Sequence, residues 1–161
     1  MNRIFRALLK PFYIKYYNSK IVKERQRTSS VNIDQLVPDA RDHSLTQNEL
    51  IKNIGLRILS VIEHMSVEFG FEYCLAYGTL LGAIRHKGYI PWDDDLDIHM
   101  TQESFDKFVK QAHHLPEGLL LTTMSVGFFK MMDLSSIVSM DLKRGVAVDI
   151  FIIKETTSDI S

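Results

Sequence analysis

The fold is decided by residues 77–100, which read YGTLLGAIRHKGYIPWDDDLDIHM. Within this stretch, Asp95-Leu96-Asp97-Ile98 alternates acidic with aliphatic side chains, the pattern of a β-strand with one buried face. We therefore expect Asp95 and Asp97 to project together while Leu96 and Ile98 enter the core. Two adjacent like charges repel each other, and a hard divalent cation such as Mg²⁺ would compensate them through carboxylate oxygens. The stretch predicts a strand that carries a metal site.

The composition is that of a soluble globular protein with one core. The chain has 161 residues, of which 45% are hydrophobic and 24% charged, and its formal net charge is −1. Residues 1–27 hold eight Lys and Arg against the single acid Glu24, so the basic charge is concentrated at the N-terminus. We expect a basic arm and linker over residues 1–44 and one domain over residues 45–161.

The sequence favours a cytoplasmic protein without a nucleic-acid partner. Cys74 is the single cysteine, which excludes an intramolecular disulfide and fits a reducing compartment. No apolar run approaches the ~18 residues of a transmembrane helix. Aromatic, aliphatic and basic residues alternate over residues 3–17, with two alternatives: a peripheral helix on anionic lipid at the inner face of the membrane, or a segment that packs on its own domain.

The first half of the domain predicts a helix, a strand and a second helix. Thr46 and Glu49 form a capping-box signature, apolar residues then recur at three- and four-residue steps, and Gly70 can end this helix. The next segments are a strand over 71–77, a turn at Gly78-Thr79 and a short helix over 80–86. Free backbone N–H groups at the start of that helix would favour a phosphate.

The second half alternates one helix with strands. Apolar spacing predicts a helix over 102–114, and apolar runs predict strands over 119–124, 128–132 and 136–142, followed by a turn at 143–145. Residues 146–153 are nearly all apolar, which is typical of a strand buried on both faces. Asp149 interrupts this run, and a buried carboxylate needs a metal, a cation or a polar cleft. The pattern indicates an α/β (α+β) fold, a mixed sheet flanked by helices.

These residues could support phosphoryl transfer. Asp95, Asp97 and Asp149 form the type of cluster that holds one or two Mg²⁺ ions, and Arg85 and Lys87 could bind the same phosphates. A solvated acidic turn is the plain alternative. An EF-hand is excluded because Ile98 replaces the required glycine of its loop, and a glycosyltransferase-type Asp-x-Asp would not explain Asp149.

The segment from Gly78 to Ile98 resembles the signature of the LicD family of phosphocholine transferases, which is related to the fukutin-type proteins. Val148-Asp149-Ile150-Phe151 is similar to the later Asp-Ile-Phe element of that family. The resemblance covers roughly residues 46–155, and such proteins belong to the nucleotidyltransferase superfamily. It implies a nucleotidyltransferase-like mixed sheet.

The resemblance also assigns roles to individual residues. It implies that Gly78 and Thr79 bind phosphate and that a further basic contact comes from Lys130. It implies that the metal, Mg²⁺ or Mn²⁺, is held by the four carboxylates Asp93, Asp95, Asp97 and Asp149. Asp97 or Asp149 is also the expected base, and the sequence does not separate base from ligand.

The implied reaction transfers phosphocholine, or a related phosphoryl-alcohol group, from a CDP-activated donor such as CDP-choline to a glycan or glycolipid. The expected acceptors are lipopolysaccharide, teichoic acid or capsule. Because family members generally continue past the Asp-Ile-Phe strand, we expect this chain to be short at its C-terminus. Two alternatives stay open: a non-catalytic relative that binds metal or nucleotide, and a nucleotidyltransferase.

Overall fold

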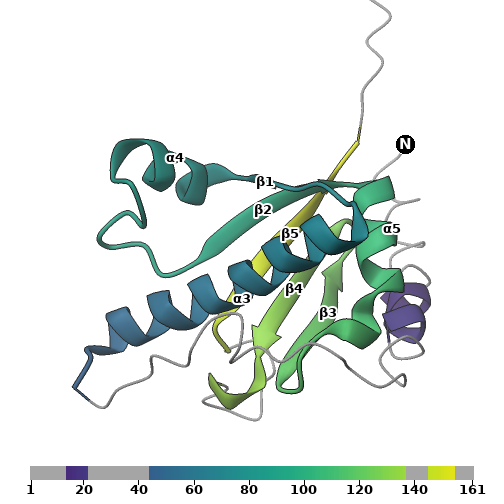
Figure 1. The fold of residues 1–161 in the computed structure, drawn as a ribbon, viewed down its shortest axis with the longest axis horizontal. Coiled ribbons are helices and arrows are strands. Elements are labelled where there is room, and N and C mark those ends of the chain that lie inside the picture. Colours follow the sequence, from purple (N-terminus) through teal and green to yellow (C-terminus); the bar gives the residue numbers. More distant parts are fainter. Residues whose placement is uncertain (1–13, 22–43, 137–144, 155–161) are drawn as a thin grey trace, which may run out of the picture.

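The structure is a computed structural model that describes residues 14–21, 44–136 and 145–154. It contains one five-stranded sheet with the strand order β1 (Cys74–Leu75), β2 (Leu96–Thr101), β5 (Ala147–Ile153), β4 (Phe128–Asp133) and β3 (Leu119–Ser125). The β2–β5 pair is parallel and the other three pairs are antiparallel. Figure 1 shows the strands with the helices α3 (Gln47–Phe69), α4 (Tyr77–Arg85) and α5 (Gln102–Lys110). The expected mixed α/β class is confirmed.

The first long helix, α3, has the ends that its sequence predicts. The Thr46 hydroxyl accepts a hydrogen bond from the Glu49 N–H at 3.3 Å, and the Glu49 carboxylate accepts one from the Thr46 N–H at 2.8 Å. Gly70 follows the helix with a φ of 64°, the left-handed conformation that glycine adopts without a Cβ clash. The capping box and the terminating glycine therefore position α3 as expected.

The segment around Tyr77 differs from the prediction. The expected strand over 71–77 is reduced to the two residues of β1, which pair with Ile98 and His99 of β2. α4 begins at Tyr77, so Gly78 and Thr79 lie in its first turn instead of in a turn before it. Tyr77, the first residue of α4, takes a φ of 45°, a left-handed backbone conformation that is rare for residues other than glycine. Apolar periodicity does not report such a backbone conformation.

The second half of the chain follows the prediction with small differences. The expected helix over 102–114 ends earlier, at Lys110, and a 3₁₀ turn, η1 (Ala112–His114), replaces its last residues. The strands expected over 119–124 and 128–132 are β3 and β4, and a second 3₁₀ turn, η2 (Leu134–Ser136), follows them. The strand over 136–142, the turn at 143–145 and most of the linker before residue 44 lie outside the described residues, apart from Ser136 and Gly145.

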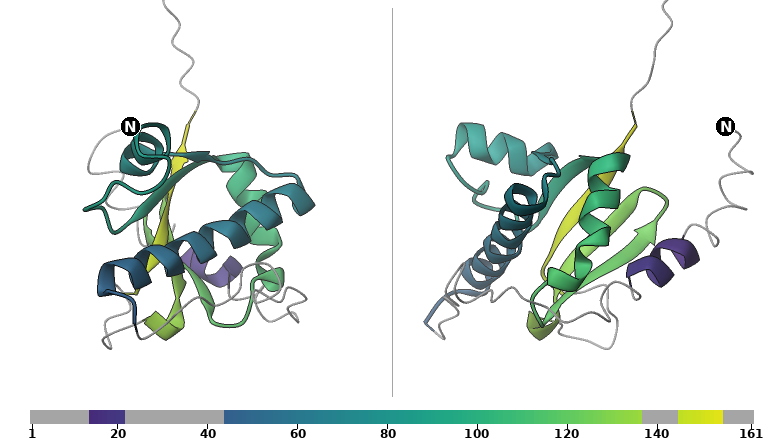
Figure 2. Two further views of the ribbon diagram at one scale, coloured as in Figure 1. Left: turned by 60° about the vertical axis from the view of Figure 1, so that its left-hand side comes forward. Right: turned by 45° about the vertical axis from the view of Figure 1, so that its right-hand side comes forward.

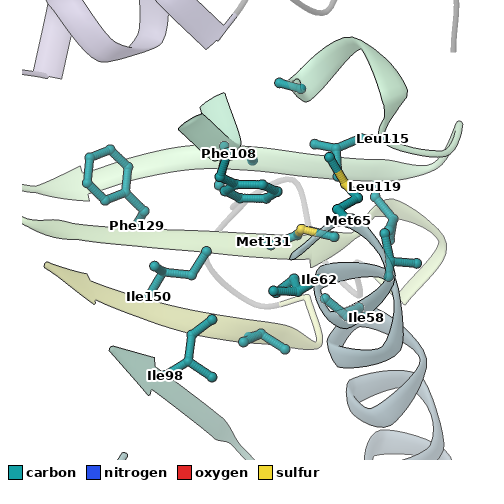
Figure 3. Close-up of a cluster of buried hydrophobic side chains, with 14 of the residues drawn as sticks. Ile58, Ile62, Met65, Ile98, Phe108, Leu115, Leu119, Phe129, Met131 and Ile150 are labelled. Carbon is teal, nitrogen blue, oxygen red and sulfur yellow. The ribbon is translucent and has the colours of Figure 1, made fainter. Parts of the chain in front are cut away.

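The hydrophobic core lies between one face of the sheet and the helices α3 and α5. Figure 3 shows Ile58, Ile62 and Met65 of α3 directed at strand residues that include Ile98 and Ile150. Figure 1 shows that α3 crosses the strands and that α5 lies beside its C-terminal part. The helices α3 and α5 thus pack on one face of β2 and β5, and the other face carries both charged and aromatic side chains.

The expectation that residues 146–153 are buried on both faces is wrong. In β5, Val148 and Ile150 are buried whereas Ala147, Asp149 and Phe151 are only half-buried. The same alternation occurs in β2, where Ile98 is buried. The run reads as continuously apolar because Phe151, which shares the second face of the sheet with Asp149, is aromatic and stacks on Phe128.

The described part of the N-terminal segment is a helix over residues 14–21, drawn in purple in Figure 2. Tyr17 is buried there, with its ring 5.6 Å from that of Phe105 and 5.2 Å from that of Phe129. Lys20 forms an ion pair of 2.9 Å with Asp106 of α5. Two alternatives were open for this segment, a helix on lipid or a segment packed on its own domain. Residues 14–21 pack on their own domain. Across the ranges that the structure covers, no helix is long and apolar enough to cross a lipid bilayer.

Candidate active site

The centre of the candidate site is a pair of aspartates on adjacent parallel strands. Asp97 of β2 and Asp149 of β5 are register partners. Directly paired residues of neighbouring strands point to the same face, so both carboxylates leave the sheet on the face opposite the core. The structure thereby brings together two predicted metal ligands that are 52 residues apart in the sequence.

Lys130 extends this pair into a row across three strands. It is the register partner of Asp149 on β4, and its Nζ lies 2.7 Å from Asp149 Oδ1. Only 23% of the Lys130 side chain and 14% of the Asp149 side chain are exposed, so the pair is partly shielded from water. Asp149 therefore has the cationic partner that its position in an apolar strand requires. The predicted contact of Lys130 with phosphate stays a prediction.

A second group of carboxylates lies in the loop just before β2. Asp93, Asp94 and Asp95 each offer an oxygen atom, and these atoms lie within 4.8 Å of one another. Asp95 precedes β2 by one residue instead of lying inside the strand. A Cβ added to Gly78 would lie 2.6 Å from Asp93 Oδ2. Glycine at position 78 thus lets the Asp93 carboxylate approach the first turn of α4.

The electrostatics unite the two groups into one acidic cluster. The pKa of Asp97 is raised to about 6, first by burial and then by the charges of Asp95, Asp149 and Asp93, against the opposing effect of Lys130. The pKa of Asp95 is also raised. Burial is the largest cause, and a hydrogen bond with Asp93 and the charges of Asp93, Asp94 and Asp149 raise it as well. Burial raises the pKa of Asp149, and the hydrogen bond and charge of Lys130 oppose it. The negative charges of the two groups therefore raise one another's pKa values.

The donor set of this cluster fits a hard divalent cation. All its ligands are carboxylate oxygens, which Mg²⁺ and Mn²⁺ prefer. The pKa values of Asp97 and Asp149 are raised although the charge of Lys130 lowers both, so the described residues compensate these carboxylates only in part. The oxygens that lie within 4.8 Å of one another are those of Asp93, Asp94 and Asp95, and a cation bound there would also reduce the repulsion that Asp97 experiences from Asp95 and Asp93. The roles of the individual ligands remain predictions.

The first turn of α4 lies against the start of β2. Thr79 Oγ1 accepts a hydrogen bond of 2.8 Å from the Asp97 N–H, and the Ala76 N–H donates one of 2.9 Å to the Asp97 carbonyl oxygen. These two bonds fix the backbone of Asp97 beside α4. Ala76, the N-cap residue, forms no side-chain hydrogen bond to the helix. The first N–H groups of a helix have no partner within the helix, and the binding of phosphate by Gly78 and Thr79 stays a prediction.

The two predicted cations after Thr79 have different positions. Lys87, together with Gly78, Thr79 and Asp93, lines a pocket of about 270 Å³ whose remaining walls are largely apolar. Arg85 lies in the last turn of α4, seven residues from Gly78, which is about 10 Å along a helix. Lys87 thus lies near the candidate phosphate site, whereas Arg85 is at the opposite end of α4.

Sequence reasoning missed an aromatic row on the same face of the sheet. His99, Phe151 and Phe128 are register partners across β2, β5 and β4, two residues along from the charged row. The signal was present as period-two spacing, since His99 follows Asp97 and Phe151 follows Asp149 by two positions. It could be recognised only after the strands had been aligned, because the register links residues from distant parts of the sequence.

Comparison with known proteins gives one family and several partial relatives. The family model described as LicD/FKTN/FKRP, nucleotidyltransferase domain, matches residues 70–160. The lipopolysaccharide cholinephosphotransferase LicD of Haemophilus influenzae is 46% identical over 56 residues, which is 35% of this chain and 21% of that protein. Uncharacterised proteins of Rickettsia prowazekii and Rickettsia typhi are each 59% identical over 32 residues, or 20% of this chain, and the match covers 12% and 10% of their lengths. The matched part of the chain thus spans about a fifth of these relatives or less.

Proposed function

The chain belongs to the LicD/FKTN/FKRP nucleotidyltransferase-domain family, and from this membership we propose that it transfers phosphocholine, or a related phosphoryl-alcohol group, from a CDP-activated donor to a glycan or glycolipid. The observation that carries the proposal is the register pair of Asp97 and Asp149 beside the first turn of α4. Facing carboxylates next to free helix N–H groups provide a cation site and an anion site side by side.

In this proposal Asp95, Asp97 and Asp149 hold Mg²⁺ or Mn²⁺, with Asp93 as a further ligand. The bound cation would neutralise phosphate oxygens and stabilise the leaving group. Gly78 and Thr79 bind the donor phosphates through backbone N–H groups and the Thr79 hydroxyl, and Lys87 adds a positive charge from the rim of the neighbouring pocket. Lys130 orients the Asp149 carboxylate through its ion pair and favours the charged form.

The proposed chemistry exchanges one phosphorus–oxygen bond for another. The acceptor hydroxyl oxygen attacks the phosphorus that bears choline, the bond from this phosphorus to the oxygen of CMP breaks, and CMP leaves. Asp97 or Asp149 takes the hydroxyl proton. The carboxylate that does not ligate the cation through the oxygen facing the hydroxyl is the one placed to accept this proton.

The choice of phosphocholine and of a lipopolysaccharide-type acceptor rests on the name of the H. influenzae relative, which shares 46% identity over 56 residues with this chain. CDP-choline is the proposed donor, because it carries phosphocholine and releases CMP as a stable leaving group. Lipopolysaccharide, teichoic acid and capsule all present sugar hydroxyls, so the site chemistry is the same for each of these acceptors.

The direct test incubates the full chain with Mg²⁺, CDP-choline and lipopolysaccharide and measures both CMP release and choline phosphate bound to the glycan. We expect Asp97→Asn and Asp149→Asn each to reduce both products at least about 100-fold, because each removes a metal-binding oxygen. Glu103→Gln is the matched control, since Glu103 pairs with Lys107 on the exposed side of α5. Full activity in Asp97→Asn would contradict the proposal.

Nucleotidyl transfer is the second candidate, because the matching family model is itself described as a nucleotidyltransferase domain. It uses the same carboxylates and differs in which phosphorus is attacked. Product analysis separates the two: transfer of CMP to the acceptor with release of phosphocholine supports nucleotidyl transfer. Binding of Mg²⁺ and CDP-choline without either product would support a non-catalytic relative.

A further inference from the structure

The aromatic row defined by His99, Phe151 and Phe128 lies immediately beside the charged row of the candidate site. On each strand the aromatic residue lies two positions from the charged one, so the rows are about 7 Å apart. Phe151 and Phe128 stack with their ring centroids 4.8 Å apart and their planes nearly parallel. Half-buried rings therefore continue the face of the sheet from the carboxylates of Asp97 and Asp149.

Tyr77 completes one end of this row. Its ring lies edge-on to His99 at 5.0 Å and to Phe151 at 5.5 Å, and the His99 and Phe151 rings are also perpendicular, at 6.3 Å. Tyr77 is 62% exposed although it is a large aromatic residue packed at the start of a helix. Its φ of 45° is rare outside glycine and persists only where the surrounding structure holds it. In this strained backbone conformation the Tyr77 ring lies against His99 and Phe151 of the sheet.

The charges around the row are asymmetric. At the β4 end, Lys130 Nζ lies 5.6 Å from the Phe128 ring, so a second cation would be repelled there. At the opposite end, Tyr77 and His99 belong to the α4–β2 corner that also carries Asp97. The corner formed by Tyr77, His99 and Phe151 therefore combines aromatic faces with nearby negative charge.

We propose that Tyr77, His99 and Phe151 form the subsite for the quaternary ammonium group of the donor. Trimethylammonium has no hydrogen-bonding atoms and is attracted to the faces of aromatic rings, most strongly where negative charge is near. In phosphocholine an O–CH₂–CH₂ linker joins phosphorus to nitrogen, and its reach is of the same order as the spacing between the two rows. The inference rests on the proposed function, since it places the phosphate of the same molecule at the carboxylate row.

The test compares phosphocholine with 3,3-dimethylbutyl phosphate, which has the same shape but replaces the charged nitrogen with carbon. Calorimetric titrations of the full chain with each compound in the presence of Mg²⁺ give two dissociation constants. We expect the wild-type chain to prefer phosphocholine about tenfold. Tyr77→Leu and Phe151→Leu should reduce this preference to less than about twofold, whereas Tyr77→Phe, which keeps the ring, should retain it.

Binding of both compounds with equal affinity would overturn the ammonium subsite while leaving the metal and phosphate site intact. A preference that survives both leucine variants would also overturn it. If neither compound binds and no CMP is released from CDP-choline, the proposed function is rejected and the subsite with it. CMP serves as the additional probe: if Tyr77→Leu weakens CMP and phosphocholine equally, the ring stacks on the nucleobase and the assignment is wrong. Thermal melting of each leucine variant checks that the fold is retained.

Discussion

Lys130 Nζ lies 2.7 Å from Asp149 Oδ1, and the two residues are directly paired across β4 and β5. The lysine is thus the fixed counter-charge of the carboxylate that interrupts an otherwise apolar strand. Burial raises the pKa of Asp149, and this contact opposes that effect by favouring the charged carboxylate. The ion pair and the proposed cation both act on the same carboxylate.

Lys130→Met should therefore destabilise the chain at neutral pH by about 1–3 kcal/mol, because it leaves a partly buried carboxylate without its partner. The loss should be smaller at pH 5, where Asp149 can bind a proton instead of remaining charged. Lys130→Arg keeps the charge and should lose less stability. Urea unfolding of the three proteins at both pH values measures the effect, and a pH-independent loss in Lys130→Met would contradict this account.

Asp97 should make the metal-free protein less stable as the pH rises. Its pKa is about 6 in the folded chain, against about 3.9 for an unperturbed aspartate. The folded state therefore binds the proton more tightly, so the stabilisation is complete below the unfolded pKa and is lost as the pH rises through 6. With EDTA present, Asp97→Asn should be more stable than the wild type by about 1–2 kcal/mol at pH 7.5, after allowance for solvent screening. This difference should shrink toward pH 4.5.

Mg²⁺ should reverse that order. A ligand that binds only the folded state stabilises it by mass action, so millimolar Mg²⁺ should raise the melting temperature of the wild type but not that of Asp97→Asn. Glu103→Gln should respond as the wild type does, because its carboxylate lies on α5 beside Lys107. An equal response of Asp97→Asn would show that Asp97 is not a ligand.

Two glycines of α4 should respond differently to alanine. A Cβ at Gly82 would lie 2.5 Å from the carbonyl oxygen of Gly88 and 3.0 Å from the Ile90 nitrogen, and backbone atoms cannot move aside easily. We expect Gly82→Ala to cost about 1–3 kcal/mol of unfolding free energy. A Cβ at Gly78 would instead meet the Asp93 carboxylate, a side-chain group that can rotate away.

Gly78→Ala should therefore change the unfolding free energy by less than about 1 kcal/mol, since alanine also favours the helix. It should weaken Mg²⁺ binding about tenfold, because the Asp93 oxygen moves. Urea unfolding and a Mg²⁺ titration of both variants separate the two effects. An equal loss of stability in Gly78→Ala and Gly82→Ala would contradict the prediction that the Asp93 side chain can rotate away from a Cβ at position 78.

The elements that the sequence predicts well are those with a local signal. α3 has a capping box at Thr46, apolar spacing and Gly70, all within the helix and its two ends. β5 is visible as an apolar run, and Asp149 could be recognised as anomalous within that run without knowledge of its partners. In both cases, neighbouring residues alone carry the information.

The features that could not be predicted depend on pairing or on single dihedral angles. The register that places Asp97 beside Asp149 and Lys130 joins segments separated by tens of residues, and nothing in their local patterns specifies it. The start of α4 depends on the left-handed φ of Tyr77, a conformation rare for tyrosine.

Tyr17 provides the test of how the N-terminal segment is used. Its ring is 5% exposed between Phe105 and Phe129, and its hydroxyl donates a hydrogen bond of 3.1 Å to Asp106. Tyr17→Ala should lower the unfolding free energy of the full chain by about 3–5 kcal/mol, because it empties a buried aromatic site. Tyr17→Phe should cost only about 1 kcal/mol, since it removes one hydrogen bond and keeps the ring.

Urea unfolding measures both variants, and Lys20→Ala is the control for the exposed part of this contact. Its ion pair with Asp106 is partly exposed and should contribute no more than about 1 kcal/mol. If Tyr17→Ala is as stable as the wild type, residues 14–21 do not pack on the domain in solution. The lipid alternative would then regain support, and sedimentation with anionic vesicles would decide it, since a helix that releases Tyr17 from Phe105 and Phe129 exposes the aromatic and basic side chains that an interfacial helix requires.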